Sequence, residues 1–487
     1  MLNYLDNDDL NKVKLLYFLE DSAQSAIGFD EIQKRISFSK FQCIRLLEGL
    51  QEDLKEFHYE EYFTLDWHTC KSAVKYKRQT HKNISILIVE YAKRAKMQKL
   101  VHFLMSEKGK RVTDLESYLY LSHSGVYRIL RKFKELSANY EIKISKKIKL
   151  LGNEWEIREF LYQFYYVLYK NFYYPFPPEL LTDCQSIIQE FLKAKIFTTE
   201  VSDINYVKML YRLSILQIRN HSGHLAENTS FMISETVYYS EEIYKIFKKY
   251  FPQNEQSLKK ETAQFLFFLE TEGIVTINQS EEQFPIQKLN IFFQEHIPFF
   301  SEKLSAFIQN DVFLKELSKI HRRLLFCKRT NFNVAHCQNF HLITEKFQIV
   351  QKLSKHIVQE LRKKQKSLHL SKEIYEELTC EYFFLIINHL PESLLSETVI
   401  IYVDFSYGTA YNNYIIKNLC AFPYRNLKIL ESQKEAIVAG VDIYLSNIPA
   451  VADYPFQVLW SATPTAYDWE SLGNTIIQAR KIKNGEM

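Results

Sequence analysis

Residues 122–136 read SHSGVYRILRKFKEL, a short stretch that is both basic and periodic. The three-and-four spacing predicts a helix with Val126, Leu130 and Phe133 on one side and Ile129 beside them. The other sides carry the polar and basic side chains of this stretch. Such a helix is either an ordinary solvated surface or a helix that lies in a DNA groove, and the neighbouring sequence helps to decide between these two interpretations.

The residues before this stretch predict the rest of a helix-turn-helix unit. Residues 85–109 have the pattern of one long amphipathic helix, and residues 112–121 predict a second helix. Thr113 and Glu116 form a capping-box pattern, which marks the start of that second helix. A short turn at residues 121–122 then leads into the basic helix.

The residues after this stretch predict a basic hairpin. Within residues 139–157, Ile142, Ile144, Ile148 and Leu150 fall on even positions, with lysines between them. Helix, helix, turn, basic helix and basic hairpin together make a winged helix-turn-helix unit. In such units the N-terminal side chains of the second helix face base edges in the major groove, and the wing lysines reach phosphate. The predicted DNA contacts are Ser122, His123, Ser124, Tyr127, Arg128, Arg131, Lys132, Lys134, Lys146 and Lys147.

A weaker copy of the same unit lies upstream. Residues 11–21, 28–36 and 37–54 predict three helices with similar spacing, and residues 57–67 predict the hairpin. Its acidic composition leaves two interpretations open, because this copy either reads bases lightly or serves as a packing partner. The corresponding DNA contacts would be Ser39, Lys40, Gln42 and Arg45.

The charge distribution favours a polyanionic partner. The whole chain has a net charge of +4, yet residues 71–150 hold 20 Lys and Arg against 6 Asp and Glu. Residues 1–70 hold 7 Lys and Arg against 14 Asp and Glu. A positive field confined to one segment indicates binding to nucleic acid more than general solubility.

Composition places the chain among cytoplasmic, multidomain proteins. Its 487 residues are enough for several domains, and no run reaches the roughly 18 apolar residues that a membrane span needs. The seven cysteines are scattered without a CxxC pair, which predicts reduced, buried thiols and no metal site. The sequence contains no P-loop, HExxH or GxSxG motif, so we expect neither an enzyme nor a cofactor.

The pattern of predicted secondary structure changes near residue 396. Before it, periodic apolar residues predict helices, with breaks at 173–180, 271–285 and 389–400. After it, strands alternate with helices, which predicts a small α/β domain with a largely parallel sheet. The predicted strands are 398–405, 427–430, 441–445 and 456–460, and the predicted final helix is 471–482.

The two N-terminal units, together with the motif LLGNEWEIREFLYQFYYVLY at 150–169, resemble the Mga family, the M-protein trans-acting positive regulators of Gram-positive bacteria. The resemblance implies a mainly α, multidomain fold. It has two helix-turn-helix units, two all-helical domains similar to phosphotransferase-system regulation domains (PRDs), and a C-terminal α/β domain similar to a IIB phosphotransferase module. The expected domains are 1–70, 71–170, 171–283, 284–392 and 393–487.

The resemblance implies a DNA-binding transcriptional regulator that is a homodimer or higher homo-oligomer, in which the second helix-turn-helix unit carries most of the DNA affinity. Phosphocarrier proteins of the phosphotransferase system would be further partners, because PRDs are switched by phosphorylation of histidine. His321 lies eight residues before Arg329, close to the usual spacing. In the first PRD-like domain Arg212 stands where the pattern places a histidine. His221 and His224, expected in a loop past the helix, are possible substitutes or ordinary loop histidines.

The C-terminal domain departs from a working IIB module. Such a module has a cysteine in the loop after its first strand, whereas this loop reads VDFSYGT at 403–409. Cys420 falls near the end of the following helix. We therefore expect no phosphotransfer here, and a sensor or dimerisation role instead. The alternatives for the whole chain are a PRD-containing RNA-binding antiterminator, a phosphocarrier component of the phosphotransferase system, and an interaction protein without a nucleic-acid partner.

Overall fold

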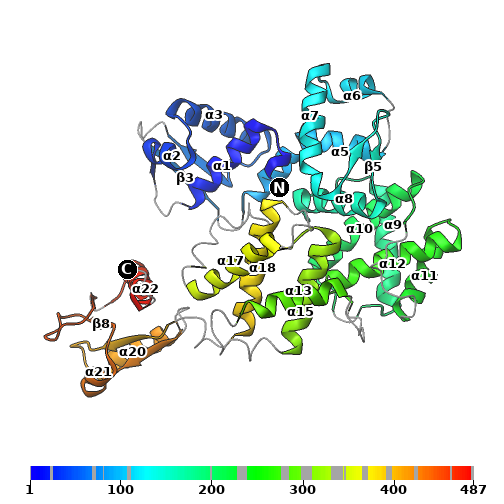
Figure 1. Cartoon of the computed structure of the whole chain (residues 1–487). Coiled ribbons are helices and arrows are strands. Elements are labelled where there is room, and N and C mark those ends of the chain that lie inside the picture. Colours follow the sequence, from blue (N-terminus) through cyan, green and yellow to red (C-terminus); the bar gives the residue numbers. More distant parts are fainter. Residues whose placement is uncertain are drawn as a thin grey trace. The chain divides into compact units, whose positions relative to one another are not determined.

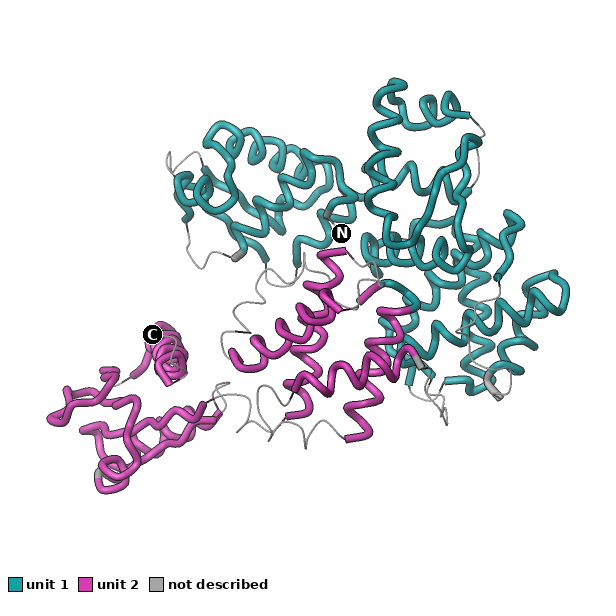
Figure 2. The backbone as a smooth tube through the Cα atoms, in the orientation of Figure 1, with its two compact units in different colours: residues 1–283, 326–328 teal, residues 284–325, 329–487 magenta. Residues whose placement is uncertain are grey.

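The computed structural model of the chain forms two compact units (Figure 2). Unit 1 comprises residues 1–283 and 326–328, and unit 2 comprises residues 284–325 and 329–487. The structure describes residues 2–21, 26–67, 73–79, 82–106, 111–197, 200–227, 238–275, 284–297, 310–330, 344, 347–364, 371–390, 397–421, 426–460 and 463–483. Most of these residues are helical, as the sequence predicts (Figure 1).

Unit 1 begins with a small helical domain that carries a three-stranded sheet. Its elements are η1 (Leu2–Tyr4), α1 (Asn7–Asp21), β1 (Ile27–Gly28), α2 (Phe29–Ile36), α3 (Lys40–Glu56), β2 (Phe63–Asp66) and β3 (Ala73–Arg78). The strands are antiparallel, in the order β1-β3-β2. The hairpin predicted within 57–67 is therefore wrong, because β2 pairs with β3 instead. A domain boundary at residue 70 would also separate β3 from its own sheet.

The second domain of unit 1 has the predicted winged helix-turn-helix order. Its elements are α4 (Ser85–Arg94), α5 (Lys96–Ser106), α6 (Val112–Leu119), α7 (His123–Leu136), η2 (Ala138–Tyr140), β4 (Lys143–Ile144), β5 (Leu150–Leu151) and α8 (Glu154–Tyr169). The single helix predicted at 85–109 is wrong, because Ala95 is extended, at φ −62° and ψ 133°, and separates α4 from α5. Strands β4 and β5 form an antiparallel wing.

The remainder of unit 1 is helical, with α9 (Pro178–Lys193), α10 (Asp203–His221), α11 (Tyr238–Tyr250) and α12 (Glu255–Thr271). Proline 178 occupies the first turn of α9, where the missing N–H costs no hydrogen bond. Aromatic side chains fill this core, as in the Phe191–Phe265 and Phe247–Phe265 pairs, whose ring centroids are 5.4 and 5.3 Å apart. The periodic aromatic residues of this region are thus packing residues.

Unit 2 contains a helical part and a sheet. Its helices before the sheet are α13 (Phe284–Glu295), α15 (Asp311–Arg322), α17 (Gln348–Lys364) and α18 (Lys372–His389), and the π-helical turn η3 (Arg323–Cys327) leads from α15 into residues 326–328 of unit 1. Phe293, Leu317, Ile357 and Phe383 are among the fully buried residues of their common core.

The C-terminal part of unit 2 is an open parallel sheet in the order β7-β6-β8-β9. Its elements are β6 (Val399–Val403), α20 (Thr409–Ala421), β7 (Leu427–Leu430), α21 (Gln433–Ala439), β8 (Ile443–Ser446), β9 (Phe456–Leu459) and α22 (Ala466–Lys483). Alternate residues of β6 face opposite cores: Val399, Ile401 and Val403 pack on one face and Tyr402 on the other.

Across the described helices of both units, none combines the length and the apolarity needed to cross a lipid bilayer.

Candidate nucleic-acid interface

Helix α7 begins where the sequence predicts and buries the predicted face. The hydroxyl oxygen of Ser122 caps the helix by accepting a hydrogen bond from the backbone N–H of Gly125 at 3.3 Å. Val126, Ile129 and Phe133 are buried. The ring of Phe133 meets that of Phe160 on α8 edge-on, with centroids 5.4 Å apart. Burial of this stripe fixes which face of α7 remains in solvent.

Helix α6 starts differently from the prediction. Its N-cap is Arg111, whose backbone N–H donates to the carboxylate of Asp114 at 2.9 Å. The Thr113–Glu116 capping box is therefore wrong, because Thr113 already lies inside the helix. The carboxylate of Glu116 instead lies 2.5 Å from Nδ1 of His123, the first residue of α7.

The exposed face of α7 carries most of the predicted DNA contacts. Helical periodicity places His123, Ser124, Tyr127, Arg128, Arg131 and Lys134 on one side, opposite the buried stripe, and all six are exposed. The ring of His123 meets that of Tyr127 edge-on, with centroids 4.9 Å apart. Ser122 differs, because its hydroxyl is used as the cap and lies 3.2 Å from that of Ser124.

Lys132 is set apart from the other basic residues of α7. Its ammonium donates to the backbone carbonyl of Leu5 at 2.9 Å, and partial burial lowers the pKa of Lys132. A lysine whose ammonium is used inside the protein is less available to phosphate. The phosphate contact predicted for Lys132 stays a prediction, and this geometry gives it no support.

The wing lies beside α7 and encloses a groove with it. Lys143, Lys146 and Lys147 are exposed on the wing, while Ile142 and Ile148 are buried. The groove has a volume of about 850 Å³. Its lining residues are Val112, Tyr127, Leu130, Arg131, Phe133, Lys134, Ile142, Lys143, Ile144, Ser145, Lys146 and Ile148. A basic helix and a basic wing thus share one concave, positively charged surface, which we call the α7–wing surface.

The cations of the α7–wing surface lack acidic partners within the described part of the chain. Six exposed cations lie on α7 and the wing, four of them in the lining of the groove, and no ion pair joins any of the six to a described carboxylate. They are Arg128, Arg131, Lys134, Lys143, Lys146 and Lys147. Their uncompensated charge makes this surface suited to an anionic ligand.

The first domain uses its predicted contact residues within the protein. Ser39 and Gln42 form a reciprocal capping box at the start of α3, with hydrogen bonds of 3.2 and 2.9 Å. The guanidinium of Arg45 lies 3.1 Å from the carboxylate of Asp8. The Lys40 ammonium lies 5.4 Å from the centroid of the Phe29 ring. A role of these residues in DNA binding stays a prediction.

Acidic side chains of the first domain form ion pairs within the protein. Asp53 accepts from Lys12 at 2.7 Å and from Arg94, on α4, at 2.9 Å. Burial alone would raise the pKa of Asp53, but Arg94 and Lys12 hold it below its ordinary value. Asp9 also pairs with Arg94, at 2.5 Å. These contacts favour the second of the two interpretations, in which this domain is a packing partner of the winged domain.

Sequence reasoning missed a buried ionic network on α8. Arg158 donates to Glu154 at 2.9 Å and to Glu261 of α12 at 2.5 Å, and Glu154 accepts from Arg219 of α10 at 2.7 Å. All four side chains are buried. Burial alone would lower the pKa of Arg158. The nearby carboxylates of Glu261 and Glu154 outweigh this effect, so the pKa of Arg158 is raised. Charged residues four apart inside an apolar helix were the available clue.

Arg212, which stands where the family pattern would place a histidine, has a packing role. Its guanidinium lies 2.6 Å from the carboxylate of Glu159 and 4.6 Å from the centroid of the Trp155 ring. This position therefore holds α8 against α10. His221 is the last residue of α10 and not part of a following loop, which corrects that expectation; His224 does lie past the helix.

His321 lies inside the core of unit 2. It is 0% exposed, with Nδ1 2.6 Å from Oδ1 of Asn290 and Nε2 2.8 Å from the hydroxyl of Tyr382. Burial lowers the pKa of His321 to about 3. A phosphoryl group could reach either nitrogen only after one of these hydrogen bonds breaks. His221, in contrast, is exposed, and its Nδ1 lies 2.8 Å from the carbonyl of Gln217.

Two backbone donors of the loop after β6 are occupied. The N–H of Phe405 donates to the amide oxygen of Asn412 at 2.9 Å, and the N–H of Ser406 donates to that of Asn447 at 2.9 Å. Backbone N–H groups at such a loop are the donors that a phosphate would need. Their use by asparagine, added to the absence of a cysteine in the sequence 403–409, supports the expectation that this loop takes no phosphate.

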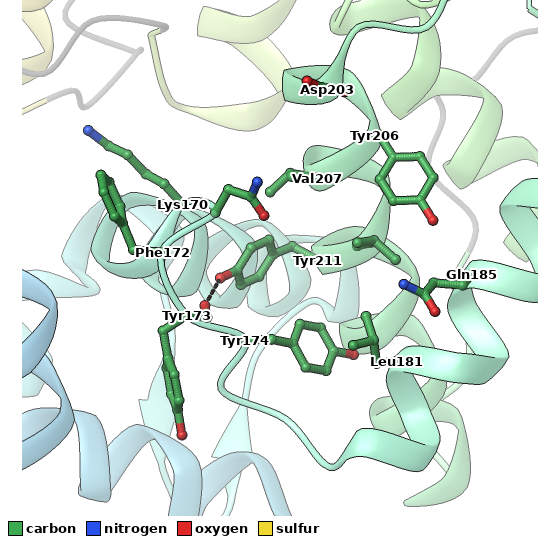
Figure 3. A pocket seen from close by; sticks show the side chains of 12 residues that line it. Lys170, Phe172, Tyr173, Tyr174, Leu181, Gln185, Asp203, Tyr206, Val207 and Tyr211 are labelled. Atoms are coloured by element: carbon green, nitrogen blue, oxygen red, sulfur yellow. Dashed lines mark hydrogen bonds between the residues drawn. The ribbon is translucent and has the colours of Figure 1, made fainter. Parts of the chain in front are cut away.

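Another hollow of unit 1 lies where the loop after α8 meets α9 and α10 (Figure 3). Its volume is about 370 Å³. Tyr174, Tyr206 and Tyr211 form part of its wall, and the hydroxyl of Tyr211 donates to the carbonyl of Tyr173 at 2.9 Å. None of the residues predicted to bind DNA or to accept phosphate lines it.

A winged helix-turn-helix unit with an unpaired basic surface defines the class of this protein, and comparison with known proteins agrees. The family described as the Mga helix-turn-helix domain matches residues 80–165. The capsule synthesis positive regulator AcpA of Bacillus anthracis is 25% identical over 252 residues, an alignment that covers 51% of this chain and 48% of the relative. The chain thus matches about half the length of that relative. The predicted resemblance to the Mga family is confirmed by these two matches.

Proposed function

We propose that this protein is a transcriptional regulator that binds duplex DNA through the α7–wing surface. The observation that carries the proposal is the set of six exposed cations without a described acidic partner. Other cations of unit 1 are paired inside the protein, as Arg158 and Arg219 are. The relatedness to the positive regulator AcpA supports the same function.

The geometry supports different tasks for the two parts of this surface. The first residues of α7 enter the major groove in a helix-turn-helix complex, so Ser124, Tyr127 and Arg128 can reach base edges. Lys146 and Lys147 at the tip of the wing can reach phosphate. Phosphate contacts set affinity and salt dependence, whereas base contacts set sequence preference.

A salt titration of DNA binding by the full chain tests this function. Lys146→Ala and Arg131→Ala should each weaken binding to all duplexes about equally and lower the salt slope by about one unit. Lys259→Ala, on the surface of α12 beside Glu255, is the matched control and should change neither quantity. Fluorescence anisotropy with labelled duplex DNA at several salt concentrations measures both.

A variant in which Arg128, Arg131, Lys134 and Lys146 are all replaced by Glu gives the decisive test. The proposal is wrong if this variant is folded and its DNA affinity keeps an unchanged dependence on salt. Tighter binding to structured RNA than to duplex DNA would favour the antiterminator alternative. Far-ultraviolet circular dichroism establishes that the variants remain folded.

We further propose that phosphorylation of histidine in the PRD-like domains controls this activity. The added negative charge would reshape a helix interface. His321 fits the spacing but needs local opening, while His221 already reaches solvent. The test is incubation of the full chain with phosphocarrier proteins, then mass spectrometry at alkaline pH, with His221→Ala and His321→Ala as variants. Absence of label at His221, His224 and His321, or phosphocysteine in residues 396–487, would contradict it.

A further inference from the structure

We propose that Glu116 holds His123 as a reader of an exocyclic amino group in the DNA major groove, that of adenine or cytosine. The inference rests on the proposed DNA-binding function. His123 is the first residue of α7, at the end of the helix that enters the groove. Glu116 lies on α6, seven residues earlier.

The contact between these two side chains fixes which nitrogen of the ring faces the DNA. Nδ1 of His123 lies 2.5 Å from Oε1 of Glu116. An ionised carboxylate only accepts hydrogen bonds, so Nδ1 must carry the proton that is shared with Glu116. In a neutral imidazole the other nitrogen, Nε2, is then a hydrogen-bond acceptor.

One further contact and the exposure of the two side chains restrict the orientation of the ring. Tyr127, one turn later on α7, meets the ring of His123 edge-on at 4.9 Å between centroids. The side chain of Glu116 is only 24% exposed, whereas that of His123 is 70% exposed. The carboxylate is therefore held against the protein while the far edge of the imidazole remains accessible.

An acceptor at Nε2 selects among the bases. In the major groove only adenine N6 and cytosine N4 present amino donors, whereas guanine and thymine present acceptors at the corresponding positions. Nε2 of His123 should therefore favour adenine or cytosine at one base pair of the binding site. Glu116 is a positioning residue in this scheme, because it acts on DNA only through His123.

The experiment begins with the full chain and selection of bound duplexes from random DNA. In the selected site, each adenine is then replaced by purine and each cytosine by 2-pyrimidinone, which removes the exocyclic amino group. At one position this removal should weaken wild-type binding roughly two- to tenfold, the size of one hydrogen bond. The same removal should have no effect on His123→Ala.

Variants of Glu116 separate positioning from structure. Glu116→Ala should lose the preference at the same base pair as His123→Ala, and the double variant should lose nothing more. Glu116→Gln keeps a side-chain oxygen that can accept from Nδ1, so it should retain the preference. Ser117→Ala, exposed on the same helix with its hydroxyl bonded to the carbonyl of Thr113, is the control and should match wild type.

The remaining outcomes would each contradict the inference about His123. Guanine or thymine preference at the position lost in His123→Ala, or equal sensitivity of wild type and His123→Ala to every amino-group removal, overturns the inference. If the selected duplexes show no base preference, the inference about His123 is wrong. The proposed function still stands in that case, because the protein binds duplex DNA. Absence of all duplex binding would overturn both.

Discussion

At the scale of single residues, His321 illustrates how burial can reverse an expectation from spacing. Its spacing leaves two interpretations open, a phosphate acceptor or a helix-surface histidine without that role, yet the Asn290 amide and the Tyr382 hydroxyl occupy both of its nitrogens. A histidine so placed makes unit 2 sensitive to acid. In an unfolded chain histidine takes up a proton near pH 6.5, whereas the pKa of His321 in the folded protein is about 3.

The sign of this effect follows from proton binding. Between pH 6.5 and about 3, His321 binds a proton in the unfolded chain but not in the folded protein. The contribution of His321 to the free energy of unfolding is therefore fully present above pH 6.5 and is lost as pH falls. The loss approaches about 1.4 kcal/mol per pH unit. Thermal unfolding of wild type and His321→Gln at pH 7 and pH 5 should show a flatter pH dependence for the variant. His221→Gln, the exposed control, should follow wild type; a dependence equal in all three contradicts the prediction.

Single residues also show which features could be predicted from the sequence and which could not. The apolar period of α7 and the alternating lysines of the wing are local patterns, so both elements were predictable. The Lys132–Leu5 contact spans 127 positions of sequence, and the His123–Glu116 contact crosses a turn between helices. Neither leaves a local pattern, because each depends on how folded elements meet. The same reason hid the pairing of β2 with β3.

At the scale of elements, α8 of the winged domain is joined to helices α10 and α12 through buried charge. The motif at 150–169 that carried the family resemblance is explained by these contacts: Asn153 caps the helix, and Glu154 and Arg158 form the network. A surface ion pair would tolerate loss of one partner. A buried pair does not, because the remaining charge has no water around it.

Replacement of Arg158 should therefore cost far more than replacement of an exposed arginine. Arg158→Met leaves the carboxylates of Glu154 and Glu261 buried with one cation fewer, and should lower the free energy of unfolding by about 3–5 kcal/mol. Arg45→Met, which removes an exposed pair with Asp8, should cost less than about 1 kcal/mol. Urea denaturation followed by circular dichroism compares the two. Similar losses in both variants would show that the network contributes no more than a surface pair.

At the scale of the whole molecule, we predict self-association through the C-terminal α/β domain. Ile437 and Val438 on α21 are 76% and 87% exposed, and apolar side chains exposed to this degree favour burial against a partner. The family resemblance implies a dimer. Sedimentation of the full chain at micromolar concentration should show an oligomer, which Val438→Glu weakens. Lys434→Glu, exposed on the same helix, is the control, and a wild-type monomer at that concentration would refute the prediction.

The short segment of residues 326–328 has a consequence for the order of synthesis. The indole N–H of Trp155 donates to the carbonyl of Phe326 at 2.8 Å, and Lys328 lies 3.2 Å from Glu156. Both partners belong to unit 1, but they are separated by residues 284–325, which belong to unit 2. On the ribosome, unit 1 therefore stays incomplete until residue 328 has emerged, well after its own last helix. Its packing around Trp155 closes only after part of the other unit has been translated.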